Sequence, residues 1–460
     1  MKRAADFFQV KNNVTFFVFS LFTIIAPLLI FGQNAFDKTG FATRRAKVFE
    51  KIGDNLAIIF GNGKHPYAVK FRQSPDFYYL TGIEEPDAIL LLDGKNKRTF
   101  IFAQRIPADR AIVEGAGLLN TENAAAIYGV NFVLPFEEFY LRLGSLLSNG
   151  TKLYLPLTPP DDLQYARDEM ILEEVDGSTH PLFKHPVRYK EAVSQLKKWC
   201  SNVQMVDVNP ILDDLRWVKT PYEIERLRMS GKIGAEGIKE AMKGTKPGMY
   251  EYELEATARF VYIKRGARGD AFIPIVASGS NTLILHYTKN SRLMQAGDIV
   301  LMDYGADYDY YTSDITRTWA VSGEFTPEQE QMYRCILEAR NAIIAVMKPG
   351  ITVKDMEDAA QIVYKKYGLE KEFLASGRYV GHFVGLSVHD VGSFEKPFVP
   401  GVVFNVEPLI QSDKLKIHMR IEDTILITAQ GAENLTAGVP VELNEIYALA
   451  KQQPISISQK

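Results

Sequence analysis

Four acidic residues and one histidine in the C-terminal half of the chain could together bind metal ions: Asp303, Asp314, His382, Glu407 and Glu422. Most of them end or interrupt a short apolar run, where an ionised carboxylate is costly to bury without a partner. Four carboxylates at one place would also repel one another, and a pair of divalent cations removes both costs. The set is rich in oxygen, with one imidazole and no thiolate. It therefore favours Mn, Co, Zn or Fe at a catalytic site over a structural zinc.

The spacing of the first two carboxylates indicates how they meet. Asp303 and Asp314 are 11 residues apart, with Gly305 in a turn-rich stretch between them. Antiparallel strands joined there would place both carboxylates side by side. Two metals held about 3.5–4 Å apart can bind one water, lower its pKa and stabilise a tetrahedral intermediate. The pattern therefore predicts a hydrolytic site.

Three further residues are candidates for contact with a substrate. They are His286, His389 and Arg420. Arg420 precedes Glu422 by two residues, so the two share a face if the segment is a strand. A single histidine is often only a hydrogen-bonded structural residue, and this alternative stays open for both histidines.

Composition excludes several classes of protein. The chain has 460 residues, 46% of them hydrophobic and 24% charged, which is enough for two or three globular domains. The net charge of −3, with no basic block, argues against nucleic acid as a partner. With Cys200 and Cys335 as the only cysteines, there is no disulfide framework or thiolate metal site.

Residues 1–35 resemble an export signal. Lys2, Arg3 and Lys11 precede an uncharged apolar stretch at 14–32. This order is typical of a signal peptide, and we expect the protein to be periplasmic or secreted. The apolar stretch is long for a signal peptide, so an uncleaved membrane anchor is the alternative.

The remaining chain divides into two predicted domains. Residues 36–210 are expected to form an α/β domain, because short apolar runs with turn residues near their ends alternate with helical stretches. The predicted strands are 56–60, 88–92, 99–102 and 152–155. Residues 211–460 are expected to form the catalytic domain.

This second domain repeats internally. Capping boxes at Thr220–Glu223 and Thr326–Gln329 start two helices. Lys246–Gly248 matches Lys348–Gly350 at an offset of 102, and aligned helical positions follow each turn. Two similar halves are therefore predicted to pack about a pseudo-twofold axis. The five candidate ligands come from both halves and would meet at the join.

The motifs around these residues resemble those of the pita-bread metallopeptidases, a family that includes aminopeptidase P, prolidase and methionine aminopeptidase. The runs most similar to aminopeptidase P are Asp303–Thr318, His382–Gly392, Val406–Pro408 and Arg420–Asp423. Phe71–Gly82 is also similar to the N-terminal domain of that subfamily. The resemblance implies an N-terminal α/β domain followed by a pita-bread domain.

The resemblance also implies roles. Asp303, Asp314, His382, Glu407 and Glu422 would hold two divalent metals. Glu407 would also accept a proton, and His286, His389 and Arg420 would complete the catalytic set.

Two positions depart from the aminopeptidase P pattern: Arg378 stands where a histidine is usual, and Gln411 where tyrosine is frequent. If Arg378 faces the cleft, it would bind substrate together with His286 and His389 and favour a peptide carboxylate. The alternative is that it points outward and pairs with a surface acid.

We therefore expect an exopeptidase that removes the N-terminal residue from peptides with proline in second position. Mn²⁺ is the favoured metal, with Co²⁺, Zn²⁺ and Fe²⁺ as alternatives. Proline-containing peptides are the expected partners, and a homo-oligomer is expected. A prolidase that cleaves Xaa-Pro dipeptides is the nearest alternative, and an inactive peptide-binding protein on the same fold is the other.

Overall fold

The computed structural model describes residues 36–64, 69–179 and 188–455. The predicted signal peptide or anchor at 1–35 lies outside these residues. Within the described part, no helix is both long and apolar enough to cross a membrane.

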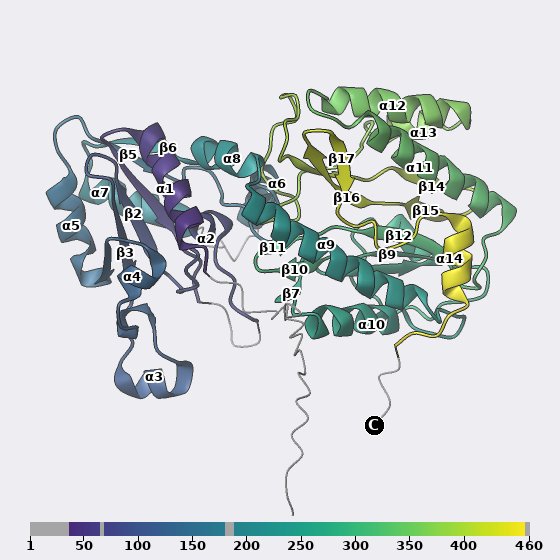
Figure 1. Cartoon of the computed structure of the whole chain (residues 1–460), viewed down its shortest axis with the longest axis horizontal. Coiled ribbons are helices and arrows are strands. Elements are labelled where there is room, and N and C mark those ends of the chain that lie inside the picture. Colours follow the sequence, from purple (N-terminus) through teal and green to yellow (C-terminus); the bar gives the residue numbers. More distant parts are fainter. Residues whose placement is uncertain (1–35, 65–68, 180–187, 456–460) are drawn as a thin grey trace, which may run out of the picture. The chain divides into compact units, whose positions relative to one another are not determined.

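The N-terminal part is built on a mixed six-stranded sheet (Figure 1). Its strands are β1 Leu56–Phe60, β2 Ile89–Asp93, β3 Arg98–Ala103, β4 Phe132–Pro135, β5 Lys152–Leu155 and β6 Gln204–Asp207, in the order β4-β3-β2-β1-β5-β6. Neighbours β1, β2 and β3 are antiparallel, and the other pairs are parallel. The four predicted strands are confirmed to within one residue at each end.

Helices surround this sheet. They are α1 Lys38–Ile52, α2 Pro75–Thr81, α3 Ala108–Glu114, α4 Ala124–Tyr128, α5 Phe139–Leu146, α6 Arg167–Ser178, α7 Arg188–Trp199 and α8 Asn209–Trp217, with short 3₁₀ turns η1 Leu118–Asn120 and η2 Phe136–Glu138. Side chains of β1 and β2 alternate between two buried clusters, so both sheet faces are covered. The predicted domain boundary at 210/211 falls within α8.

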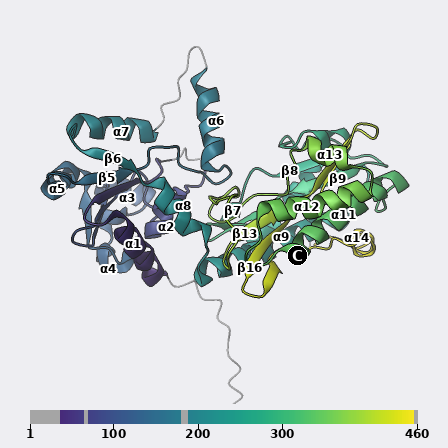
Figure 2. The same cartoon turned by 90° about the horizontal axis from the view of Figure 1, so that it is seen from above.

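The C-terminal part begins with α9 and repeats a helix pair. Its helices are α9 Pro221–Met242, α10 Glu251–Lys264, α11 Pro327–Val346, α12 Val353–Lys366, α13 Glu370–Ala375 and α14 Leu443–Ala450. The capping boxes predicted at Thr220 and Thr326 both form, and α11 ends before Lys348 as expected. In Figure 1 the strands lie between α9 and α10 on one side and α11 and α12 on the other, and Figure 2 shows α11 and α12 side by side.

The strands of this part form small sheets that bring the acidic residues inward. They are β7 Gly269–Asp270, β8 Ile275–Ser278, β9 Ile299–Asp303, β10 Ala306–Tyr308, β11 Tyr311–Thr312, β12 Thr316–Ala320, β13 Val403–Val406, β14 Leu409–Ser412, β15 Ile417–Arg420, β16 Asp423–Thr428 and β17 Gly431–Asn434, with the 3₁₀ turn η3 Gly279–Leu283. Antiparallel β9 and β12 pair Asp303 with Thr316, two residues after Asp314. The predicted hairpin is therefore present, and the N-terminal α/β and C-terminal pita-bread architecture is confirmed.

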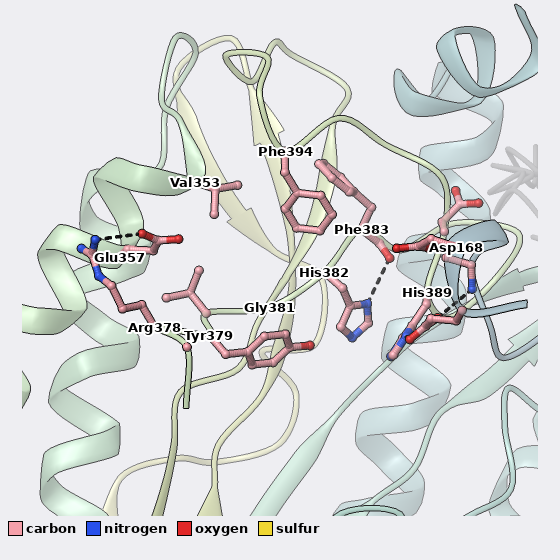
Figure 3. A pocket seen from close by; sticks show the side chains of 15 residues that line it. Asp168, Val353, Glu357, Arg378, Tyr379, Gly381, His382, Phe383, His389 and Phe394 are labelled. Carbon is pink, nitrogen blue, oxygen red and sulfur yellow. Dashed lines mark hydrogen bonds and ion pairs between the residues drawn. The ribbon is translucent and has the colours of Figure 1, made fainter. Parts of the chain in front are cut away.

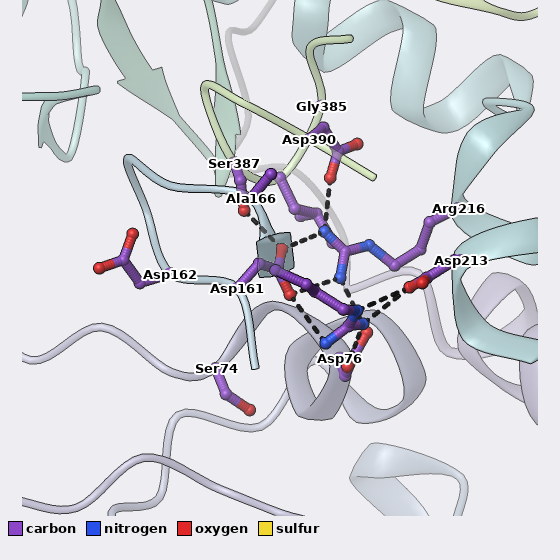
Figure 4. A network of polar contacts seen from close by, with 12 residues as sticks. Ser74, Asp76, Asp161, Asp162, Ala166, Asp213, Arg216, Gly385, Ser387 and Asp390 are labelled. Carbon is purple, nitrogen blue, oxygen red and sulfur yellow. Dashed lines mark hydrogen bonds and ion pairs between the residues drawn. The ribbon is translucent and has the colours of Figure 1, made fainter. Parts of the chain in front are cut away.

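A buried network of charges joins the two parts (Figure 4). Arg216 of α8 lies 2.8 Å from Asp76 of α2 and 2.6 Å from Asp161, and it also contacts Asp390 of the C-terminal part. Arg167 adds a second cation 2.7 Å from Asp76. Burial raises the pKa of Asp161, but the charges of Arg216 and Arg167 outweigh it and bring the pKa to about 2. The cations therefore keep this carboxylate ionised inside the protein.

Replacing Arg216 should destabilise the fold strongly. Arg216→Met leaves three buried carboxylates short of a partner, so we expect the free energy of unfolding to fall by about 3–5 kcal/mol in denaturant titrations near neutral pH. Because the folded-state pKa of Asp161 lies below its usual 3.8, its contribution is present above about pH 4 and is lost as the pH falls toward 2. The difference between wild type and variant should shrink over that range.

The matched control is Arg228→Met, which removes a half-exposed ion pair with Glu433 and should cost about 1 kcal/mol or less. Equal losses in the two variants would contradict the role given to Arg216.

Candidate metal centre

The five predicted ligands are brought to one place by ends of strands and the loops beside them. Asp303 ends β9, Asp314 precedes β12, Glu407 follows β13, and Glu422 lies between β15 and β16. His382 lies in the loop after α13. All five are buried, with 1–7% of each residue exposed. The first two come from the first half of the repeat and the others from the second, as predicted.

Distances from the imidazole of His382 define the cluster. Its Nε2 lies 3.4 Å from Asp314 Oδ2, 3.7 Å from Glu422 Oε1 and 3.8 Å from Glu407 Oε2. Asp314, His382 and Glu422 each offer a ligand atom within 4.8 Å of the others. Arg420 links Asp303 to this cluster. Its guanidinium contacts Asp303 and lies 2.8 Å from Glu407.

The carboxylates disturb one another's ionisation. Burial, and then the charges of Asp303 and Glu407, raise the pKa of Asp314 well above its usual range. Burial and neighbouring carboxylates, with Asp314 first among them, do the same for Glu422. Arg420 opposes both shifts without cancelling them. The four carboxylates cannot all stay ionised beside Arg420 alone, and further positive charge would be needed to keep them so.

This donor set fits divalent cations. Asp303 Oδ1 and Asp314 Oδ1 are buried and accept no hydrogen bond from any described residue. Such oxygens are costly inside a protein unless a cation or donor meets them. Carboxylate oxygens with one imidazole suit divalent metals of the first transition row. These residues therefore form a candidate centre for divalent metal, although their individual roles as ligands stay predictions.

The imidazole of His382 is oriented by its own loop. Its Nδ1 lies 3.1 Å from the carbonyl oxygen of Phe383, so Nε2 is left facing the carboxylates. A metal-binding histidine usually donates its other N–H in this way. Gly381 is required beside it, because a Cβ there would lie 1.7 Å from the carbonyl oxygen of Asn405.

Two residues that the sequence analysis missed hold Glu422. The amide of Asn405 donates to Glu422 Oε1, and the hydroxyl of Thr316 donates to Oε2. Asn405 stands two residues before Glu407, on the same face of the extended chain, so strand alternation could have identified it. Thr316 stands two residues after Asp314 at the start of β12, so the same alternation could have identified it.

A cavity of about 340 Å³ lies beside the cluster (Figure 3). His382 and Tyr379 line it together with residues of both parts of the chain. Figure 3 shows the ring of Tyr379 directed toward His382. Burial, the charge of Glu407 and a hydrogen bond to that carboxylate raise the pKa of Tyr379. The phenol therefore stays protonated and contacts the site, which the sequence analysis did not foresee.

The three predicted substrate residues have different positions. His389 lines the cavity, its ring centre is 4.0 Å from that of His382, and its Nδ1 lies 2.7 Å from Glu169 Oε1. Burial, and then the neighbouring His382, lower the pKa of His389. His286 is exposed in the loop between η3 and β9, so the structure does not bring it into the buried cluster. Arg420 lies within the cluster.

Arg378 turns away from the cluster toward α12 (Figure 3). Its guanidinium lies 3.2 Å from Glu357 and 2.5 Å from Asp358. The backbone of Arg378 has φ 62°, which is rare for a residue with a side chain. Arg378 therefore pairs with acids of α12, as the alternative expects, while it and Glu357 also line the cavity beside the cluster.

Comparisons with known proteins agree with this geometry. The model of metallopeptidase family M24 matches residues 225–429, and that of the aminopeptidase P N-terminal domain matches residues 41–154. A Xaa-Pro aminopeptidase of Haemophilus influenzae is 32% identical over 90% of this chain and 97% of its own length. A Xaa-Pro dipeptidase of Pyrococcus furiosus is 34% identical, over 51% of this chain and 68% of its own.

A solved structure of Escherichia coli aminopeptidase P in complex with substrate is similar over 90% of this chain and 98% of that chain, with a TM-score of 0.75 and 30% identity. The chain therefore belongs to metallopeptidase family M24 and is a metal-dependent hydrolase. Within that family its N-terminal domain and its full-length relatives place it in the aminopeptidase P group.

Removing either Asp314 or Glu422 should abolish metal binding. Added Mn²⁺ should raise the melting temperature of metal-stripped wild type, because a ligand that binds the folded state stabilises it. Asp314→Ala and Glu422→Ala should lose that rise, and peptidase activity should fall by more than about 10²-fold. Asp413→Ala, at an exposed acid in the turn between β14 and β15, is the control and should behave as wild type. If either site variant still binds two metal ions, the assignment of these residues as metal ligands is wrong.

Proposed function

We propose that the protein removes the N-terminal residue from peptides whose second residue is proline. The observation that carries the proposal is the convergence of four buried carboxylates and His382 beside a cavity of about 340 Å³. Its size lies within the range of ligand-binding pockets. The resemblance to Xaa-Pro aminopeptidases over nearly their whole length supports the choice of substrate.

The chain's own residues can provide acid–base chemistry. Glu407 has one oxygen held 2.8 Å from Arg420 and contacts the phenol of Tyr379, so its carboxylate is fixed in place. It is positioned to accept a proton from an attacking water and return it to the leaving nitrogen. In the proposed reaction His389, at the cavity wall, contacts the substrate through Nε2, which is the acceptor nitrogen when Nδ1 carries the proton. Bound divalent cations would supply the positive charge that polarises the scissile carbonyl.

The proposal includes two metal ions, held by Asp303, Asp314, His382, Glu407 and Glu422. Mn²⁺ is favoured because most of the donors are carboxylate oxygens. Co²⁺, Zn²⁺ and Fe²⁺ are the alternatives that metal analysis of the purified protein would distinguish.

We also propose a homo-oligomer. The apolar side chains of Ile112 and Val113 on α3 are 87% and 82% exposed, as expected of a surface that another copy covers. Sedimentation of the purified protein as a monomer would overturn this.

Prolidase activity is the nearest alternative, and the extent of similarity argues against it. The archaeal dipeptidase matches about half of this chain, whereas the aminopeptidase matches 90% of it. The N-terminal part reaches the cavity through Ala166, Asp168 and Glu169, so it helps to shape the space available to substrate.

A peptide panel tests the substrate class. In defined Mn²⁺, Xaa-Pro-Yaa tripeptides should be cleaved to free Xaa and Pro-Yaa, while Xaa-Ala-Yaa controls should stay intact. Chelation should abolish cleavage and added metal should restore it. Cleavage confined to Xaa-Pro dipeptides would establish the prolidase alternative, and a protein that binds no metal and cleaves none of the peptides would establish the binding-protein alternative.

We further propose that residues 1–35 direct export to the periplasm or outside the cell, since basic residues precede an uncharged apolar stretch. Expressed in its host, the mature protein should begin near Gln33 or Phe36 when its N-terminus is sequenced. Intact Met1 on soluble cytoplasmic protein would contradict export, and intact Met1 on membrane-bound protein would establish the anchor instead.

A further inference from the structure

The segment from Asp161 to Glu169, which belongs to the N-terminal part, runs along the loop that carries His389. The main-chain N–H of Val388 donates to the carbonyl of Leu163 at 2.9 Å, and that of His389 donates to Gln164 at 3.2 Å. The hydroxyl of Ser387 donates to Asp161 at 2.7 Å. Successive residues of the His389 loop are therefore hydrogen-bonded to a segment more than 200 positions earlier.

Glu169 extends this contact to the imidazole itself. Its Oε1 lies 2.7 Å from His389 Nδ1, and its Oε2 accepts the N–H of Ala166 at 2.8 Å. The carboxylate is thus fixed at one oxygen by the start of α6 and presents the other to the ring. The side chain of Glu169 is 34% exposed and that of His389 is 23% exposed, so the pair is partly shielded from solvent.

The start of α6 is itself held in place. Arg167, two residues before Glu169, lies 2.7 Å from Asp76 and 2.8 Å from Asp213 in the buried network of Figure 4. Glu169, whose carboxylate faces His389, therefore lies in the first turn of a helix that ion pairs hold in place. Both Glu169 and His389 line the cavity beside the metal cluster (Figure 3).

We propose that Glu169 is a positioning residue for His389. By accepting the Nδ1–H, it fixes the orientation and tautomer of the imidazole and leaves Nε2 as the nitrogen available to a substrate atom. This inference rests on the proposed function for its kinetic consequences, but the hydrogen bond itself can be observed without substrate. An exposed ion pair without such a role would contribute little to stability.

Kinetics of matched variants test the proposal. Glu169→Leu removes the acceptor at similar size and should lower kcat about tenfold or more, with KM and bound metal little changed. Glu169→Gln keeps an acceptor oxygen and should stay within about threefold of wild type. Glu173→Leu, one turn further along α6 and exposed, is the control and should have no effect. An equal loss in Glu169→Leu and Glu169→Gln, or an unchanged Glu169→Leu, would overturn the role of the acceptor.

A double-mutant cycle separates positioning from a general structural effect. Adding Glu169→Leu to His389→Ala should lower kcat no further, because the residue that it positions is gone. The same fold-loss in both backgrounds would overturn the proposal.

Histidine nitrogen NMR gives a readout that needs no substrate. The His389 signal, assigned by its loss in His389→Ala, should show the Nδ1–H tautomer in wild type and shift toward Nε2–H in Glu169→Leu. An unchanged spectrum would overturn the proposal whatever the peptide assays show. A wild type that cleaves no peptide would instead overturn the proposed function alone.

Discussion

The crowding of four carboxylates into one buried cluster is the constraint on which the catalytic part depends. Each charge raises the cost of its neighbours, as the raised pKa values of Asp314 and Glu422 show. A loose fold would relieve that repulsion by moving the groups apart. Here the carboxylates stand at or beside the ends of strands in two halves of a repeat, where paired backbone holds them together. The fold therefore holds together carboxylates that can all be ionised only with added positive charge, which divalent cations would supply.

Charge also organises the junction between the two parts, but in a different way. Around Arg216 the cations and carboxylates are paired directly, so the network needs no metal. Buried ion pairs of this kind are weak sources of stability, since desolvation offsets much of their attraction. What they fix here is geometry: Asp390 is held immediately beside His389, and Arg167 is held two residues from Glu169. The N-terminal part thereby sets the position of a cavity residue.

Local signals in the sequence predicted much of the fold and most of the cluster. Continuous apolar runs predicted the strands, and the capping boxes at Thr220 and Thr326 predicted two helix starts. Both kinds of signal depend only on residues that are close in sequence. The carboxylates were conspicuous because they ended apolar runs. Glu169 gave no such signal, since its partner is 220 residues away. The direction of Arg378 was equally hidden, because its partners Glu357 and Asp358 lie about 20 residues earlier in the chain.

The two departures from the aminopeptidase P pattern lie in the surroundings of the cluster and leave its ligands unchanged. Arg378 is paired with Glu357 and Asp358, and Gln411 is exposed, with its amide 3.3 Å from Asp413. The inward phenol comes from Tyr379, which contacts Glu407 although position 411 carries no tyrosine. A hydroxyl is thus present beside Glu407. The chemistry is therefore expected to follow the family, while Arg378, which lines the cavity, is where substrate preference would differ.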